Sequence, residues 1–243
     1  MMLCSALLRK VDVMKKRLLL AAFIIAAAMI ILNWPLTYRV GVDGVVSEKK
    51  IPLYAKACGF LYRDWMYKDI VRSIVNDKMS DEEKALAIMR WTTENIKGKV
   101  PVGLKTVDDH PLNIIIRQYG QEDQLEDVFT ILCSYTGVYG GMYKCYNDDK
   151  SKFIILSFVN TKTGQWLIFD VSKNKYFLND KGGVASVSDY LEGKIILSDE
   201  DKAMYGDYFD DIRNIDFSSM TRASEQMPIR RVMVEMRKIF GKK

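Results

Sequence analysis

Few residues of this sequence could act as nucleophiles or bases: there are four cysteines and a single histidine, His110. Cys4, Cys58, Cys133 and Cys145 include no Cys-x-x-Cys pair, and no set of cysteine and histidine has the spacing of a zinc site. A glycine-rich phosphate loop and an EF-hand loop are also absent from the sequence. We therefore expect no metal and no cofactor. Cys133 and Cys145 could form one disulfide, but free, buried thiols are the preferred interpretation.

Two carboxylates occupy positions where they could do chemistry. Glu122 lies in the first turn of a predicted helix that Gly120 introduces by breaking the chain, and Asp170 ends a predicted strand. A first-turn Glu commonly interacts with the helix dipole, and a strand-end Asp commonly accepts hydrogen bonds from turn amides. Alternatively, Glu122 and Asp170 form an acid/base pair across a cleft, as the two carboxylates of glycosidases do.

An apolar run of fifteen residues, 18–32, lies near the N-terminus. Five basic residues precede this run and Trp34 follows it, which predicts a transmembrane signal anchor over 18–35 with its N-terminus in the cytoplasm. We therefore expect a single-pass membrane protein whose domain is periplasmic or extracellular. A cleaved signal peptide is the alternative, although its one small-residue site, Ala26 to Ala28, lies inside the apolar run.

The net charge of +5 gives little support to a nucleic-acid-binding function. Much of the positive excess lies at the two ends of the chain, and the middle is close to neutral, so no basic groove for nucleic acid is expected. The length suits one domain of ordinary size beside the membrane segment. We expect a basic N-terminus over 1–17, the anchor over 18–35, a linker over 36–50, a domain over 51–200 and an extension over 201–243.

Hydrophobic spacing predicts helices in the first half of the domain. The ranges are 54–75, a helix to Ile96 opened by the Ser80-x-x-Glu83 capping box, a short helix after His110-Pro111, and a helix from Gln121 to Tyr135. Alternating residues then predict strands over 138–146, 153–160 and 165–171, with a short edge strand over 176–179. Ser186 or Ser188 is expected to cap a further helical turn. Helices followed by an antiparallel meander indicate the α+β class.

The C-terminal tail from Pro228 has the pattern of a basic amphipathic helix. Ile229, Val232, Met233, Met236 and Phe240 share one face, and arginine and lysine occupy the other. Such a helix can dock on the domain or lie on anionic lipid. Both interpretations remain open from the sequence.

The order and spacing of these features resemble the transglutaminase-like (papain-like cysteine hydrolase) domain over about Ser80 to Leu197. Gly120 before the helix, Leu132-x-x-x-x-Gly137-Val138 at its end, and Trp166-x-x-x-Asp170 in the meander carry the resemblance. It implies a papain-like core of helices followed by an antiparallel meander. It also implies an active site with a cysteine at the helix start, a histidine on a strand and an aspartate on the next strand.

The departures from this family pattern concern its catalytic residues. Glu122 occupies the cysteine position, and Ile155, or Ile154 if the hairpin differs by one residue, occupies the histidine position. Asp170 alone is retained. Cys133 lies about 16 Å along the helix from Glu122, by the rise of 1.5 Å per residue, so it cannot replace the nucleophile. A thiolate paired with an imidazole is what this chemistry requires, so no catalytic residue is expected at the degenerate triad Glu122, Ile155 and Asp170.

The sequence therefore predicts a membrane-anchored, extracytoplasmic pseudoenzyme that serves as a binding or scaffolding module of the cell envelope. Its ligand would be an envelope protein, a peptide or a glycan. One alternative is a divergent hydrolase that acts on an envelope peptide or glycan with Glu122 and Asp170 as acid/base pair. Another is an assembly subunit that uses the tail helix as its contact surface.

Overall fold

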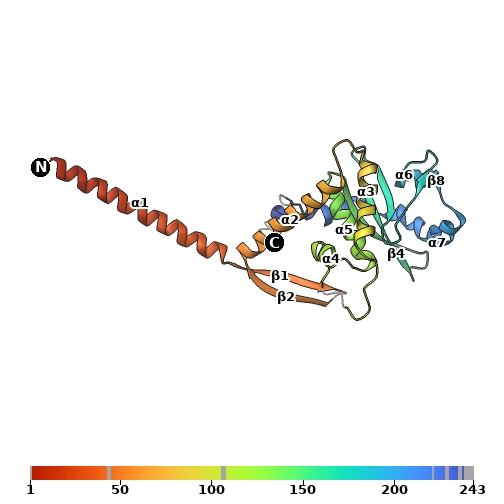
Figure 1. Ribbon diagram of the computed structural model, residues 1–243, viewed down its shortest axis with the longest axis horizontal. Helices are drawn as coiled ribbons and strands as arrows, with labels where there is room; N and C mark the ends of the chain where they lie inside the picture. Colours follow the sequence, from red (N-terminus) through yellow and green to blue (C-terminus); the bar gives the residue numbers. More distant parts are fainter. Residues whose placement is uncertain are drawn as a thin grey trace. The chain divides into compact units, whose positions relative to one another are not determined.

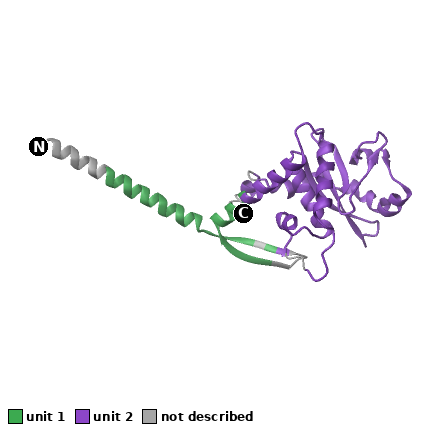
Figure 2. Cartoon of the chain, viewed as in Figure 1, with its two compact units in different colours: residues 1–40, 45–61 green, residues 41–44, 62–243 purple. Residues whose placement is uncertain are grey.

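The computed structural model describes residues 2–42, 45–104, 108–220, 222–227, 230–234 and 237. The chain divides into two compact units, shown in Figure 2. Unit 1 comprises residues 1–40 and 45–61, and unit 2 comprises residues 41–44 and 62–243. Figure 1 labels several elements of each unit. Helices and antiparallel strands occur in separate stretches of the chain, which confirms the α+β class.

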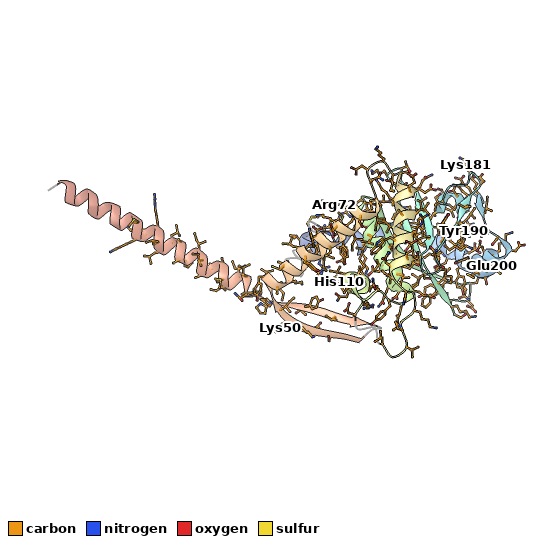
Figure 3. All side chains as sticks on the ribbon, viewed as in Figure 1. Lys50, Arg72, His110, Lys181, Tyr190 and Glu200 are labelled. Carbon is orange, nitrogen blue, oxygen red and sulfur yellow. The ribbon has the colours of Figure 1, made fainter. Side chains whose placement is uncertain are left out.

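Unit 1 contains α1 (Met2–Leu32), the two strands β1 (Pro35–Val42) and β2 (Val45–Pro52), and the first part of α2 (Leu53–Ile74). The long apolar side chains of α1 from Leu18 onward are exposed (Figure 3). Within the described ranges, no helix combines the length and the apolar character that crossing a membrane requires. The transmembrane segment expected over 18–35 is therefore not supported, since its apolar run of fifteen residues falls short of the usual 20 or so.

Residues expected to form a linker instead pair as the two-stranded sheet of β1 and β2. The alternation of Leu36, Tyr38, Val40 and Val42 with smaller or polar residues explains this, because a period of two is the pattern of a strand. Residues 43 and 44, between the two strands, lie outside the described residues.

Four helical segments form one side of unit 2: residues 62–74 of α2, α3 (Asp81–Asn95), α4 (Pro111–Arg117) and α5 (Glu122–Tyr135). The predicted capping box opens α3, because the Ser80 amide donates to Glu83 Oε2 at 2.7 Å and the Glu83 amide donates to Ser80 Oγ at 3.1 Å. In α5, every residue from Gln124 to Ser134 is buried, so this helix is the centre of the unit. Each of these helices was expected from the sequence within two or three residues of its observed ends.

The main sheet has four strands in the order β3-β4-β5-β6, and they are antiparallel. Its strands are β3 (Tyr139–Tyr146), β4 (Phe153–Asn160), β5 (Trp166–Asp170) and β6 (Lys175–Tyr176). The meander of three strands is confirmed. The fourth expected strand is divided, because Leu178 and Asn179 form β7, which pairs with β8 (Ile195–Ile196) in a separate small sheet.

Each face of the main sheet is covered by its own hydrophobic core. On the first face, Val159, Leu167 and Phe169 pack in the core that contains Phe129 of α5. On the second face, Leu156, Phe158 and Ile168 pack in the core that contains Tyr205 and Phe209. Successive side chains of a strand point to opposite faces, so each residue of β4 and β5 can be assigned to one core. We call the first face the α5 face and the second face the α7 face.

The α7 face is built by residues that follow position 200, where the domain was expected to end. The helical elements after β7 are α6 (Val187–Leu191), which precedes position 200, and then α7 (Asp199–Phe209), the 3-10 helices η1 (Asp210–Asn214) and η2 (Phe217–Ser219), and α8 (Arg222–Glu225). Tyr205, Phe209, Ile212 and Ile215 belong to the second core, and Ala223 belongs to the first. The core of unit 2 therefore extends to about residue 223. Ser186 caps α6, as predicted.

Candidate functional site

The start of α5 is organised by the buried amide of Gln124 and leaves Glu122 exposed. Gln124 Oε1 accepts hydrogen bonds from the Gln121 amide at 3.1 Å and from Arg117 Nη2 at 2.7 Å. Gln124 Nε2 donates to Asp109 Oδ1 at 2.6 Å. These three contacts join α5 to the segment before it. The helix start is therefore occupied by the protein's own polar side chains.

Gly120 is needed at this start because of close packing. A Cβ atom at this position would lie 2.9 Å from Gln124 Oε1 and 3.3 Å from Ile114 Cγ2. The first distance is shorter than real Cβ contacts, and the Gln124 amide cannot move without losing its hydrogen bonds. The glycine that the sequence presents as a helix breaker thus makes room for the Gln124 network.

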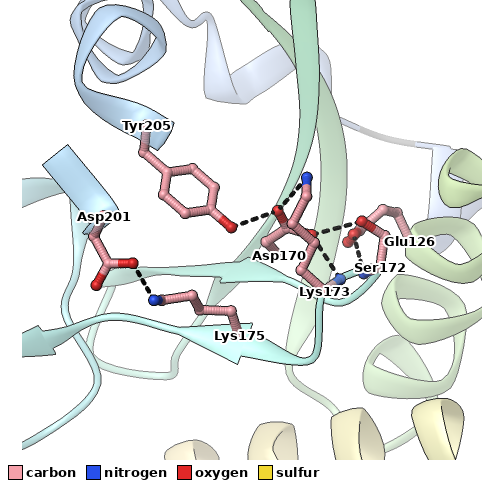
Figure 4. A network of polar contacts seen from close by, with 7 residues as sticks. All are labelled: Glu126, Asp170, Ser172, Lys173, Lys175, Asp201 and Tyr205. Carbon is pink, nitrogen blue, oxygen red and sulfur yellow. Dashed lines mark hydrogen bonds and ion pairs between the residues drawn. The ribbon is translucent and has the colours of Figure 1, made fainter. Parts of the chain in front are cut away.

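One turn further along α5, the carboxylate of Glu126 is completely buried (Figure 4). Glu126 Oε2 accepts a short hydrogen bond of 2.5 Å from Ser157 Oγ on β4, and Glu126 Oε1 accepts one of 2.9 Å from the Ser172 amide. Burial raises the pKa of Glu126 well above its ordinary value, and the negative charge of Asp170 raises it further. Glu126 thus joins the central helix to two segments of the sheet and can hold a proton there.

Asp170, at the end of β5, is also completely buried (Figure 4). Its Oδ1 accepts hydrogen bonds from Ser172 Oγ at 2.7 Å and from the Lys173 amide at 3.0 Å. Its Oδ2 accepts from Tyr205 Oη at 2.9 Å and from Lys173 Nζ at 3.3 Å. The two oxygens thus accept four hydrogen bonds, which is the number of lone-pair sites on a carboxylate. Such a carboxylate is fully engaged in holding the turn after β5 and α7 together.

The three positions of the degenerate triad are not brought together. Ser157 and Phe169 are partners in the register of β4 and β5, and both contact α5, through Glu126 and Phe129 respectively. Ile155 lies two residues before Ser157 and therefore also points to the α5 face. Asp170 follows Phe169 and points to the α7 face, where it meets Tyr205. A side chain at position 155 thus points away from the Asp170 carboxylate.

Ile154, the alternative histidine position, lies on the other face of the sheet from Ile155. Ile154 packs in the core of the α7 face, which is the face toward which Asp170 points. Glu122 is nevertheless an exposed residue of α5, on the other side of the sheet. Among the described residues, no hydrogen bond or ion pair joins Glu122 to Asp170. Of the pair proposed from the sequence, Glu122 is thus exposed, and Asp170 is completely buried and hydrogen-bonded to Tyr205.

Glu126 was missed because hydrophobic spacing predicts a helix with one apolar face and places carboxylates outside it. By the 100° rotation per residue, Glu126 lies only about 20° from the direction of Cys133, which is buried in the same core as Phe129. A carboxylate at the border of an apolar face is the signal that could have identified it. Its partners, Ser157 and Ser172, come from segments whose proximity to α5 only the fold determines.

The cysteines and the histidine are not arranged for catalysis. Cys133 and Cys145 are buried free thiols in the cores of opposite sheet faces, so the alternative of a disulfide between them is excluded. Burial raises the pKa of both thiols, that of Cys145 to about 12. His110 caps α4, with its Nδ1 accepting from the Leu112 amide at 3.3 Å. Burial and the positive charge of Arg63 lower the pKa of His110 to about 4, which keeps the ring neutral.

A second buried carboxylate of α5 is held by the C-terminal segment. Asp127 Oδ2 is 2.6 Å from Arg222 Nη2 of α8. Burial raises the pKa of Asp127 to about 6, and the guanidinium of Arg222 opposes this rise. Over the ranges that the structure describes, no group of three or more histidine, cysteine or carboxylate side chains has the arrangement of a metal site.

Comparison with known proteins gives little for assigning this chain. No protein-family model and no curated protein matches it. Among solved structures, the chain is similar to a crystal structure from Parabacteroides distasonis described as a "putative protease", with a TM-score of 0.32 and 11% sequence identity. The similarity covers 62% of this chain and 40% of that chain, so the chain spans less than half of the length of the structure it matches. A TM-score of this size does not establish a common fold.

Proposed function

We propose that unit 2 is a transglutaminase-like domain that has lost its catalytic cysteine and histidine and serves as a binding or scaffolding module of the cell envelope. The resemblance in sequence supports the first part of this proposal. So does the order of elements, in which α5 is followed directly by the antiparallel strands β3, β4 and β5, with Asp170 ending β5. A fold of this kind does not fix a function, because function depends on the side chains of the site.

One observation carries the non-catalytic part of the proposal: the polar groups at the centre of the domain are bound to one another. Asp170 accepts four hydrogen bonds within the protein, and Glu126 is completely buried between Ser157 and the Ser172 amide. A catalytic carboxylate needs a lone pair or a proton directed at a substrate. In this arrangement both carboxylates join secondary-structure elements, which is the behaviour of a structural network.

The acid/base alternative is not part of this proposal. Glu122 is exposed, whereas Asp170 is completely buried and accepts a hydrogen bond from Tyr205 of α7. A pair of glycosidase carboxylates must face the same bond from a separation of about 5–10 Å. Glu122 fits better as a partner of the helix dipole in the first turn of α5.

Membrane attachment through α1 is the second part of the proposal and rests on the sequence. The apolar run 18–32 follows Lys15, Lys16 and Arg17, and Trp34 comes just after it. Because this run is short for a spanning helix, attachment would depend on the basic side chains and on Trp34 reaching the two interfaces. A periplasmic or extracellular domain would follow from the positive charges before the run. A reporter fused after Lys243 tests this, since activity found only in the cytoplasm would contradict the orientation.

The binding function is tested by purifying the tagged full-length protein from detergent-solubilised cells. We expect one envelope protein, peptide or glycan to be retained in a fixed ratio to the chain. A Glu126→Gln variant is the matched control, because it removes a completely buried acid from the centre of the domain while retaining its shape. A binding module retains the same partner in both forms. Loss of a measurable hydrolase activity in Glu126→Gln, or the absence of any specific partner, would contradict the proposal.

A further inference from the structure

The C-terminal segment after α8 places apolar side chains in solvent. Residues 230–234 and 237 are helical, and the Arg231 amide donates to the Met227 carbonyl oxygen at 2.8 Å, a bond typical of an α-helix. The side chains of Val232 and Met233 are 56% and 44% exposed. The apolar face predicted for this tail is therefore not docked on the domain at these two positions.

One contact of this segment with the domain is made by the cation of Arg230. The Arg230 guanidinium lies 4.8 Å from the centre of the Tyr139 ring, at the start of β3. Such a contact directs Arg230 toward the domain. By a rotation of about 100° per residue, Val232 then lies about 160° from Arg230, on the far side of the helix, and Met233 lies about 60° from it. The orientation of the segment thus accounts for the exposure of Val232, and Met233 is exposed beside the cation.

Charge identifies the partner that would cover them. From Arg230 to Lys243 the sequence has six basic residues and one acid, Glu235. Arg237, one turn after Met233, is exposed. Two apolar side chains are too few for a stable protein interface, which takes about 800 Å² from each partner. Apolar residues that alternate with several cations on a helix match the boundary between anionic headgroups and acyl chains instead.

We propose that the segment from Arg230 to Arg237 binds an anionic lipid surface, with Val232 and Met233 entering the headgroup boundary and Arg237 contacting the phosphates. This contact is separate from the attachment proposed for α1, and it needs no partner protein. It would hold the C-terminal side of unit 2 at a membrane whose surface is negatively charged.

A local probe tests this contact whether or not α1 also enters the membrane. An environment-sensitive dye is attached to Val232→Cys in the full-length protein, with Cys4→Ser and Cys58→Ser as background, since Cys133 and Cys145 are buried. The matched control carries the dye at Val102→Cys, a fully exposed valine of unit 2. Vesicles of phosphatidylcholine alone are compared with vesicles that also contain phosphatidylglycerol, at a ratio of about 3:1.

We expect a blue shift of the dye at position 232 with at least about tenfold higher apparent affinity for the phosphatidylglycerol vesicles. About 0.5 M NaCl should abolish the blue shift, because salt screens the attraction between basic side chains and anionic headgroups. Arg237→Glu should weaken the response about tenfold, and Lys181→Glu, another exposed charge reversal, should not. An equal response to both vesicle types, an equal response of the Val102→Cys control, or no effect of Arg237→Glu would overturn the proposal. If the tagged protein retains no envelope partner, the expected dye results stay the same, because the lipid contact needs no partner protein.

Discussion

The phenol of Tyr205 donates a hydrogen bond of 2.9 Å to Asp170 Oδ2 across 35 residues of sequence. Both residues are completely buried, and Lys173 Nζ approaches the same oxygen at 3.3 Å. This bond attaches α7 to the end of β5, at the aspartate that the family resemblance would assign to catalysis. Asp170 therefore has a structural role that would preserve it without any reaction.

Replacing Tyr205 with Phe should measure this role. The variant removes only the donor, so we expect the free energy of unfolding to fall by about 1.5–3 kcal/mol, the range for a hydrogen bond to a charged group. Urea unfolding at neutral pH measures the change. Tyr208→Phe, in the same helix and only partly buried, should change it by less than about 0.5 kcal/mol. Equal losses in the two variants would contradict the importance of the Asp170 contact.

Glu126 should make the protein less stable as the pH rises. Its pKa is raised in the folded protein, so the folded state binds the proton more tightly than the unfolded state does. Stability from this proton is fully present below the ordinary pKa of about 4.5 and is lost as the pH rises toward the folded-state pKa. Burial raises the pKa of Asp127 to about 6, so Asp127 contributes in the same direction.

Urea unfolding at several pH values from about 5 to 8 tests this sign. Glu126→Gln keeps the shape of the side chain and cannot ionise, so the decline of stability with pH should become smaller. Asp127→Asn is the companion variant, and any decline that remains in Glu126→Gln should diminish when both changes are combined. A wild-type protein whose stability rises over this range would show that Glu126 is ionised at little cost in the fold.

Replacing each of two glycines with alanine should change the free energy of unfolding in opposite directions. Gly120→Ala places a Cβ atom 2.9 Å from Gln124 Oε1, so we expect a loss of about 1–3 kcal/mol in the free energy of unfolding. Gly206 lies inside α7 with no atom within 4 Å of such a Cβ, so Gly206→Ala should stabilise the protein by about 0.5–1 kcal/mol. Thermal unfolding of both variants distinguishes them. A neutral Gly120→Ala would mean that the Gln124 network adapts easily.

A cysteine at position 122 tests whether the start of α5 still favours a thiolate, as a nucleophile site would. The sequence alone predicts that Glu122→Cys has a pKa below the free value of about 8.5, because it lies at a helix start, and that Ile155→His lowers it further. The structure bears only on the role of Asp170: position 155 points to the sheet face opposite the Asp170 carboxylate, so Asp170 would not orient an imidazole there.

Alkylation by iodoacetamide against pH measures both expectations, with Cys4 and Cys58 replaced by serine. We expect the single variant to react with a midpoint below the free value and the double variant to have the same midpoint. Unchanged reactivity of the buried Cys133 and Cys145 serves as the internal reference. A lower midpoint in the double variant would show that the imidazole does reach the thiol and that the triad positions are close in solution.

Much of the local structure was determined by the sequence. The Ser80 capping box, the helical spacing of Leu125, Phe129 and Leu132, and the alternating strands 139–146 and 153–160 are patterns within a few residues. Hydrogen bonding and burial over such short ranges depend on neighbouring residues alone, so these elements and the α+β class followed directly. The strands over 35–52 carried the same signal and were overlooked, and α7, despite its Ser198 cap, was not predicted.

The site was decided by the tertiary structure. Glu126 meets Ser157 and the Ser172 amide over separations of 31 and 46 residues, and Tyr205 meets Asp170 over 35. These distances depend on the strand register and on which helix covers each face of the sheet, since a shift of one residue moves every side chain to the opposite face. The sequence could identify Glu122, Ile155 and Asp170 by spacing, but it could not determine that the sheet separates Ile155 from the Asp170 carboxylate. That separation is set by packing on both faces at once, which no local pattern contains.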